Sequence, residues 1–476
     1  MKTPMKKSSR LKGFYKLNRG ERMDQLLAFS SLPSDQARIL GQDGALPFEI
    51  TDLFIENAVG TYPLPLGIAT NFRINGRDYL VPMAVEESSV VAATSNAARW
   101  VYESNPAGPG FETEVLSSMM IGQIQLLDLP VKDFPAAESK LRAAAPSLLR
   151  IANETHPRLL MRGGGAREIE VRSFPEAEIP FLVVHVHLDC RDAMGANLVN
   201  TVCERLGTEI EEITGGRVGL RILSNLADRK LYRARARVNP ELLSLKDAAL
   251  TLDGPTIARR IVEAYVFADS DPYRAATHNK GIMNGVDPVV IATGNDWRAV
   301  EAGAHAFAAT AGRGDHPGVV GGNEARHPGR YRSLSKWSVD SQGWLVGELT
   351  IPLQLGTVGG VTRLHPLAQV SLQILGDPSS DELGQVVACA GLAANLAALR
   401  ALTTTGIQRG HMKLHAKNLA LGAGARGGEV DAVSVQMVRA GKVSSSAAEI
   451  FLAEFRKHVS WNPEAAVTDV PKGAIE

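Results

Sequence analysis

The order of secondary-structure patterns between residues 114 and 224 constrains the fold of this chain more than any other feature. A strand, a helix and a strand are followed directly by a second strand, helix and strand. The predicted elements are the strand Met120–Leu127, the helix Ala136–Ala152, the strands Ile169–Arg172 and Phe181–Leu188, the helix Ala196–Ile213 and the strand Val218–Leu223. This order is typical of a split βαβ, ferredoxin-like module. We therefore predict an α+β fold in which such a small module is inserted.

The segments that flank the module predict a larger, mainly helical domain. Residues 1 to about 55 have an amphipathic helical pattern, with Met23, Leu26 and Phe29 among its apolar positions. Asn75-Gly76 carries the signal of a tight β-hairpin between two strand patterns. The last 70 residues are again mainly helical, with a hinge expected near Thr403–Gly406.

Composition excludes several classes of protein. The chain has 51 basic and 51 acidic residues among 476, whereas nucleic-acid-binding proteins usually carry a basic excess. It contains no run of about 18 apolar residues, so no membrane-spanning helix is expected. Its three cysteines are widely spread and form no disulfide framework or metal cluster. We expect a cytoplasmic protein without nucleic-acid or membrane partners.

The polar stretch Asp271–Trp297 is the first candidate for a functional site. Glycine and asparagine are dense in it, which favours tight, positive-φ turns, and the apolar run Val289–Ala292 is predicted to be a buried strand. A lysine near apolar surface, here Lys280, can stabilise an oxyanion, and a nearby carboxylate keeps it protonated. The alternative is a polar turn with solvated charges.

A second candidate is the pair Glu86 and Glu87, which ends the apolar run Val81–Val85. Adjacent strand residues point to opposite faces, so only one of these carboxyls can enter a given pocket. A carboxylic acid beside apolar residues has a raised pKa and can act as a general acid. The alternative is that both carboxylates stabilise the N-terminus of the helix that follows.

The turn Asp192–Asn197 joins a strand to a helix, and its small residues let a diphosphate approach the N–H groups of that helix. Gly163–Gly165, between basic residues, could face the same phosphates. The alternative for both is an ordinary connection. The GxGxxG spelling at Gly422–Gly427 follows a helical pattern instead of a strand, so we reject it as a cofactor loop.

Histidines occur in two short patterns. His411 and His415 lie one helical turn apart, but no third zinc ligand is obvious, and a general-acid role for His411 is the sharper hypothesis. His185 and His187 share one face of a predicted strand, where a structural role on the sheet is expected.

Several of these blocks, in the same order, resemble one protein family. They include Glu56–Gly60, similar to an ENVxG dimerisation signature, the 192–197 block, the 271–297 stretch and Gln408–Met412. From about residue 13 to 456 the chain resembles the class II 3-hydroxy-3-methylglutaryl-coenzyme A (HMG-CoA) reductases.

The resemblance implies a chemistry and a set of site residues. HMG-CoA would be reduced twice, to mevalonate and CoA, with two reduced nicotinamides, or the reverse reaction would occur. Lys280 is implied to stabilise the oxyanion, and Asp296 to hydrogen-bond the Lys280 side chain. Glu87 is implied to protonate the aldehyde oxygen, and His411 to protonate the departing thiolate. The implied substrate contacts are Arg274, Ser89, Thr277 and Asn284. No metal is implied.

The resemblance also implies a domain division and an assembly. Residues 1–113 and 225–406 would form the large domain, 114–224 the small dinucleotide-binding domain and 407–476 a helical flap. The implied cofactor contacts are Asp192, Met194, Gly195, Asn197, Asn225, His156 and Arg158. The active site would form between two subunits, in a homodimer or a higher oligomer of dimers.

Two departures from the family pattern affect the cofactor and the turn at Glu87. His156 stands where NAD-specific members carry an aspartate, so repulsion of a 2′-phosphate is lost, and Arg158 or Arg162 could pair with that phosphate. NADPH, or use of both cofactors, is therefore favoured over NADH alone. Ser88 stands where the family usually has proline, and an insertion at 312–332 has no assigned role.

Two other functions are alternatives. A reductase of another acyl-CoA would turn over simple acyl-CoA compounds, which a carboxylate-binding Arg274 opposes. A non-catalytic CoA- or nucleotide-binding homologue would be expected to lack at least one of the four implied catalytic residues, and all four are present.

Overall fold

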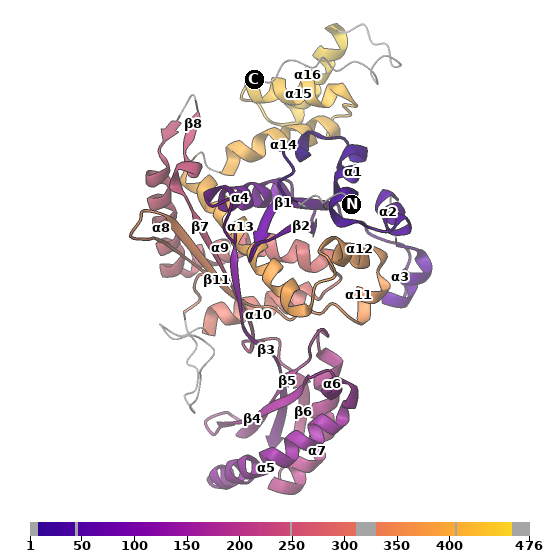
Figure 1. The fold of residues 1–476 in the computed structure, drawn as a ribbon, viewed down its shortest axis with the longest axis vertical. Helices are drawn as coiled ribbons and strands as arrows, with labels where there is room; N and C mark the ends of the chain where they lie inside the picture. The colour runs from indigo at the N-terminus through magenta and orange to yellow at the C-terminus, as the bar shows by residue number, and fades with distance from the viewer. Residues whose placement is uncertain (1–7, 43–45, 248–249, 311–329, 405–406, 459–476) are drawn as a thin grey trace, which may run out of the picture.

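The computed structural model describes residues 8–42, 46–247, 250–310, 330–404 and 407–458. A small α/β module lies at one end of the elongated molecule, three C-terminal helices lie at the other, and the large body lies between them (Figure 1). Most of the 312–332 insertion and part of the hinge expected at Thr403–Gly406 fall outside the described residues.

The small module has the predicted β-α-β-β-α-β order, so this prediction is confirmed. Its strands are all antiparallel, with β3 between β5 and β6 and with β4 at the far side of β5. Side chains of β3 and β5 such as Ile124 and Val184 form one apolar core with α5 and α7. The elements are β3 (Glu112–Leu127), α5 (Phe134–Thr155), α6 (Pro157–Met161), β4 (Gly165–Phe174), β5 (Phe181–Asp189), α7 (Ala196–Thr214) and β6 (Arg217–Leu223).

Strand β3 joins the module to the large body. Its first half pairs with β7 (Lys230–Val238), and its second half pairs with β5 and β6. β7 continues the sheet through β11 (Leu345–Pro352) to β10 (Ser335–Val339). The expected domain boundary at residue 114 therefore falls inside a continuous strand.

The large body is built around two long helices, α9 (Pro272–Ala292) and α13 (Ser380–Thr403), which pack on each other. Both helices share one apolar core with the strands β7, β10 and β11. Around them lie α4 (Val90–Ser104), α8 (Gly254–Ser270), α10 (Trp297–Thr310) and the hairpin of β1 (Leu66–Ile74) and β2 (Arg77–Ala84). The predicted Asn-Gly turn is confirmed, since Asn75 and Gly76 both have positive φ, 47° and 82°.

The strand predicted at Val289–Ala292 is wrong, because these residues form the last turn of α9. The density of glycine and asparagine before it does not make turns either, since Gly281 and Gly285 lie inside the same helix. The start of the helix had a sequence signal: the Asp271 side chain accepts from the Tyr273 backbone N–H, and Pro272 occupies the first turn. Local β-branched residues were outweighed by packing on α13.

α13 is the one helix in the described part of the chain that is long and apolar enough to cross a membrane. Two thirds of its apolar window (67%) is buried inside the protein, where it packs against α9. It is therefore a core helix of this body.

The remaining elements lie at the periphery. The N-terminal helices confirm the helical prediction for this region, and the three C-terminal helices have a small apolar core of their own, which includes Ala416, Val433 and Leu452. The elements are α1 (Arg19–Ser30), α2 (Ser34–Gly41), α3 (Phe48–Phe54), β8 (Leu245–Asp247), β9 (Leu250–Leu252), α11 (Gly360–Leu364), α12 (Pro366–Ile374), α14 (Ile407–Gly422), α15 (Gly428–Arg439) and α16 (Ser445–His458).

Candidate active site

An ion pair joins two of the predicted catalytic residues. The Lys280 Nζ donates to Oε2 of Glu87 at 2.8 Å, although 193 positions separate the two residues in the chain. Glu87 lies in the turn between β2 and α4, and Lys280 lies on α9, which packs against β2. Glu86, by contrast, is exposed. The prediction that one of the two glutamates takes the functional position therefore points to Glu87.

The alternative helix-capping role for the two glutamates does not fit the structure. Helix α4 begins at Val90 with Ser89 as its N-cap, and its first turn contains no acidic residue. Ser89 has a φ of 73°, a left-handed conformation that is uncommon outside glycine. This bend turns the chain sharply between the carboxylate of Glu87 and the helix.

The exposed stripe of α9 carries the predicted substrate contacts together with the lysine. Arg274, Thr277, Lys280 and Asn284 are separated by three, three and four residues, so a helix places them within about one third of its circumference. The opposite side of α9 is buried and includes Ile282 and Val286. Partial burial lowers the pKa of the Arg274 guanidinium from its ordinary value, but arginine stays protonated in proteins.

Asp296 lies at the other end of α9 and has different partners in this chain. Its Oδ1 accepts from the backbone N–H of Arg298 at 3.1 Å and of Ala299 at 3.2 Å, at the start of α10, and pairs with the Arg298 guanidinium at 3.4 Å. Within the described residues no hydrogen bond or ion pair joins Asp296 to Lys280. The predicted bond between them stays a prediction.

A cavity of about 2090 Å³ opens beside this site. Ser89 lines it, as do Ile291 near the end of α9 and Thr61 and Tyr62 after the ENVxG-like segment. Its lining contains a set of basic side chains from the N-terminal region and α4, against one acidic residue, Glu103. The basic residues are Arg10, Lys12, Lys16, Arg19, Arg22 and Arg99. Sequence reasoning missed this basic wall because its members come from separate segments and share no motif.

The 192–197 turn forms the open N-terminus of α7. Gly195, with a φ of 104°, is the N-cap, and no side chain caps the helix. A Cβ at Gly195 would lie 2.5 Å from the Cys190 sulfur, so only glycine fits. Asn197 is exposed in the first turn, and Met194 is half-buried. The uncapped N–H groups of this long helix suit an anionic ligand.

The 192 turn is also the joint between the module and the large body. Asp192 Oδ1 accepts from the backbone N–H of Ser380, at the start of α13, and its carbonyl accepts from Thr357. The Asp192 side chain therefore links the small module to the large body through its hydrogen bond with Ser380. Asn225, which follows the module, is exposed, and its carbonyl accepts from the Gln354 side chain.

The glycine triplet and the residues at 156 and 158 lie close to this turn. The Gly163 carbonyl accepts from the guanidinium of Arg191, the residue before Asp192. The His156 ring Nε2 lies 3.2 Å from the carbonyl of Leu198 in the first turn of α7, and Arg158 is exposed on α6. The structure thus brings Gly163 and His156 to the N-terminal end of α7, beside the 192–197 turn.

His411 belongs to α14, but its side chain lies outside what the structure describes. Its predicted role as a general acid stays a prediction.

Fold and site together define a class of protein: a large helical body with an inserted ferredoxin-like module, a Lys–Glu pair between the core helix α9 and the turn after β2, and an uncapped helix N-terminus in the module. Comparison with known proteins narrows this class. A sequence model of hydroxymethylglutaryl-coenzyme A reductase matches residues 20–416. The chain is 47% identical over 449 residues to 3-hydroxy-3-methylglutaryl-coenzyme A reductase of Archaeoglobus fulgidus, covering 94% of this chain and 95% of that protein.

Other relatives agree. A probable 3-hydroxy-3-methylglutaryl-coenzyme A reductase of Borreliella burgdorferi is 36% identical over 365 residues, 77% of each chain. The solved Streptococcus pneumoniae reductase is similar with a TM-score of 0.75 at 40% identity, covering 94% of this chain and 99% of that one. A second structure, of the class II enzyme from the same organism bound to NADPH in open conformations, has a TM-score of 0.73, covering 82% of this chain and 99% of that one.

The chain therefore belongs to the HMG-CoA reductase family and is an oxidoreductase. The resemblance to the class II form is confirmed.

Proposed function

We propose that this chain reduces HMG-CoA to mevalonate and free CoA with two equivalents of NADPH, or catalyses the reverse oxidation, in the cytoplasm. The observation that carries the proposal is the 2.8 Å contact between Lys280 on α9 and Glu87 in the turn after β2, in a chain of this family. An ammonium group and a carboxyl group at one point are what a carbonyl reduction needs.

The chemistry follows from those two side chains. A reduced nicotinamide supplies the hydride, and negative charge then develops on the carbonyl oxygen of the substrate. The ammonium of Lys280 stabilises that charge, since a fixed cation in a water-poor site lowers the barrier most where charge develops. Glu87, in its protonated form, delivers the proton that turns the alkoxide into a hydroxyl, while Lys280 keeps its own charge; the 2.8 Å contact between them places both groups at the same carbonyl oxygen.

The remaining roles come from the resemblance. Asp296 orients Lys280 in the substrate-bound enzyme, and His411, carried on the flap 407–476, protonates the departing CoA thiolate. The small apolar core shared by α14, α15 and α16 supports a flap that moves as one body. Arg274 holds the substrate carboxylate, with Ser89, Thr277 and Asn284 around it.

The large cavity fits the CoA half of the substrate. CoA carries several phosphate charges, and the cavity wall offers six basic side chains against one acidic one. Tyr62 lines the cavity and is 92% exposed, and Val59, three positions before it, is 99% exposed. Exposed apolar side chains at a site mouth suit a second subunit, so we propose a homodimer that closes the site.

For the cofactor, we propose NADPH on the small domain 114–224. The open N-terminus of α7 accepts the diphosphate, with Asp192, Met194, Gly195, Asn197 and Asn225 around it. His156 leaves a 2′-phosphate unopposed, and the exposed Arg158 can pair with it. The NADPH-bound relative supports this choice.

One assay tests the proposal. The near-ultraviolet absorbance of reduced nicotinamide is followed with HMG-CoA and either NADPH or NADH, and with acetyl-CoA as the comparison substrate. We expect turnover of HMG-CoA, faster with NADPH, and none of acetyl-CoA. Equal turnover of both thioesters would favour the other acyl-CoA reductase, and binding of HMG-CoA without turnover would favour the non-catalytic homologue.

A further inference from the structure

Two histidines and a glutamate meet on the sheet of the small module, on the face opposite α5 and α7. Strands β4 and β5 pair so that Glu170 lies opposite His185 and Glu168 opposite His187. Side chains alternate along a strand, so these four share one face, while Val184 and Val186 point to the apolar core. The sequence placed the two histidines on one face but showed nothing of the glutamates that face them.

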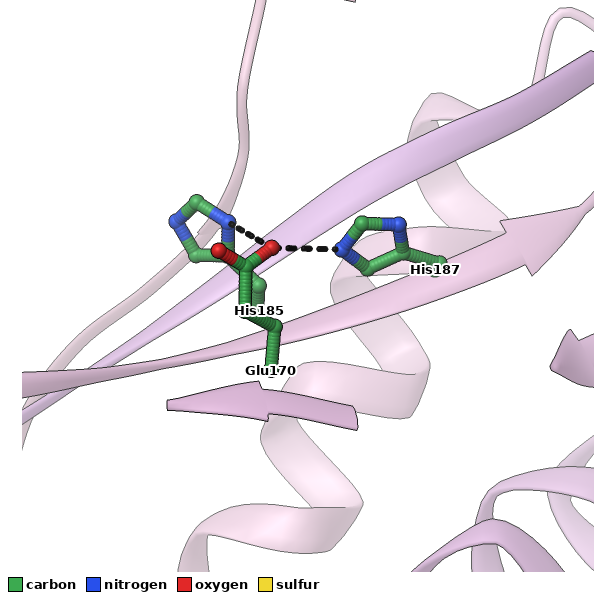
Figure 2. Close-up of side chains that lie close together, drawn as sticks. All are labelled: Glu170, His185 and His187. Carbon is green, nitrogen blue, oxygen red and sulfur yellow. Dashed lines mark ion pairs between the residues drawn. The ribbon is translucent and has the colours of Figure 1, made fainter. Parts of the chain in front are cut away.

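The ligand-type atoms of three of these residues are close together. Glu170 Oε2 lies 3.4 Å from His187 Nε2 and 4.0 Å from His185 Nδ1, and the three side chains' ligand atoms lie within 4.8 Å of one another. Figure 2 shows the carboxylate of Glu170 between the two imidazole rings. A tetrahedral metal ion with ligands at about 2 Å needs donor atoms roughly this far apart, after small shifts.

His187 is buried but poorly hydrogen-bonded. Its side chain is 1% exposed, its Nε2 has only the 3.4 Å ion-pair contact with Glu170, which lacks good hydrogen-bond geometry, and its Nδ1 has no hydrogen-bond partner among the described residues. Leaving a buried polar group without a partner costs about 1–3 kcal/mol. A metal ion on Nε2 would satisfy the ring.

The groups behind the histidines are of the kind that orient metal ligands. His187 Nδ1 lies 3.9 Å from Oε2 of Glu168, and His185 Nε2 lies 3.0 Å from the side-chain amide of Gln123. If the amide of Gln123 is turned over, its oxygen accepts from His185 Nε2–H, which leaves Nδ1 as an acceptor for a metal. Histidine ligands usually donate their second N–H to a carboxylate or carbonyl oxygen in this way.

We propose that Glu170, His185 and His187 bind a divalent transition-metal ion, with Zn²⁺ the best fit and a water molecule as the fourth ligand. Two imidazoles and one carboxylate suit Zn²⁺ better than Ca²⁺ or Mg²⁺, which prefer oxygen ligands. Arg229 is the nearby positive charge, with Nη2 4.0 Å from Glu170 Oε2. The two carboxylates outweigh it, so the site still attracts a cation.

The role of this ion is to stabilise the small module. It ties β4 to β5 on the strand that leads into the 192 turn, and it takes no part in the reduction. Because the ligands come together only in the folded module, binding raises the free energy of unfolding in proportion to the logarithm of free Zn²⁺ over its dissociation constant.

Calorimetric titration of the chelator-treated full chain with Zn²⁺ tests the site. We expect one equivalent bound per chain, with an affinity that falls at least roughly 100-fold in His187→Gln and in Glu170→Gln. His415→Gln, an exposed histidine on α14, is the matched control and should bind like the wild type. It also tests the other histidine pair, His411 and His415.

Two further measurements keep the test independent of folding. Glu170→Gln preserves size at a side chain that is 33% exposed, and its circular dichroism and unfolding in chelator should match the wild type. Wild-type protein loaded with Co²⁺ should show the visible absorption of a four-coordinate ion, and the variant should not. The proposal would be overturned if the wild type bound no Zn²⁺, or if the wild type and both site variants bound it equally. Loss of binding in His415→Gln alone would also overturn it.

Discussion

At the scale of single residues, the Lys280–Glu87 pair is weakly held. The two side chains are 61% and 38% exposed, and exposed ion pairs contribute only about 0–1 kcal/mol. A substrate oxygen can therefore replace Glu87 as the partner of the Lys280 ammonium group at a small cost in free energy. This exchange lets one lysine first hold the acid in place and then stabilise the oxyanion.

Replacing Lys280 with alanine should lower turnover of HMG-CoA by about 10²–10³-fold or more, because the developing charge loses its cation. Binding of HMG-CoA and NADPH, measured by calorimetry, should change only a few-fold. Lys336→Ala, an exposed lysine on β10, is the control and should keep full activity. Turnover retained in Lys280→Ala would remove this residue from the mechanism.

His278, two residues before Lys280, has a structural role instead. It is 2% exposed, and its Nε2 contacts Ser335 Oγ at 2.7 Å and Asn395 Nδ2 at 3.2 Å. Burial, and then the charge of Arg274, lower the pKa of His278 from 6.5 to about 3. The folded state therefore holds a neutral ring where the unfolded chain would bind a proton.

This depressed pKa makes stability depend on pH. The contribution of His278 is fully present above pH 6.5 and is lost as the pH falls from there toward 3, since only the unfolded state gains the proton. At pH 5 the loss is about 2 kcal/mol. Urea unfolding at pH 7.5 and 5 should show this difference in the wild type and a smaller one in His278→Asn, whereas identical pH dependence in both would contradict it.

At the scale of elements, the crossing of α9 and α13 sets the position of the whole substrate stripe. The two backbones approach so closely that a Cβ at Gly285 would lie 2.2 Å from the carbonyl oxygen of Ala390. This helix–helix contact, and not a flexible turn, is the reason for glycine at this position.

Gly285→Ala should therefore destabilise the protein by about 1–3 kcal/mol, because α9 must move away from α13. Gly281→Ala is a matched control in the same helix, since its Cβ would meet only the Ala398 Cβ at 3.8 Å. Gly281→Ala should leave the free energy of unfolding unchanged or raise it by up to about 1 kcal/mol, because alanine has the higher helix propensity. Denaturant unfolding compares the two, and equal stability of the variants would show that the crossing is not tight.

At the scale of the whole molecule, one chain leaves the Lys280–Glu87 pair exposed to solvent. Exposed apolar residues lie in and beside the ENVxG-like segment, among them Val59, and two of them, Ile55 and Tyr62, line the cavity. Helices α14, α15 and α16, which belong to the proposed flap, lie at the end of the molecule away from the small module (Figure 1). Both a second subunit and flap movement are consistent with a site that closes only in the working assembly.

Val59→Asp should therefore shift the protein from dimer to monomer and lower activity about tenfold or more, since a buried unpaired charge costs several kcal/mol at an interface. Analytical ultracentrifugation measures the mass, beside the activity assay. Ile179→Asp, a control at an exposed apolar position of the small module, should change neither. A Val59→Asp protein that stays dimeric would place the interface elsewhere.

The sequence by itself determined those elements whose local period and turn chemistry agree. The strands and helices of the small module and the Asn75-Gly76 hairpin were predicted correctly, because alternation, amphipathic spacing and positive-φ residues act within a few positions. Local patterns also marked Lys280, the Glu86–Glu87 pair and the 192–197 turn as candidates, and the resemblance assigned their roles and chose Glu87.

Only the tertiary structure decided which distant side chains meet. Local β-branched residues in α9 suggested a strand, but burial against α13 made that segment a helix. Lys280 pairs with Glu87, which lies 193 positions away in the chain, and the glutamates facing His185 and His187 had no signal in the order of residues. Such pairings depend on strand register and helix packing summed over the whole body, and no short window of sequence contains that sum.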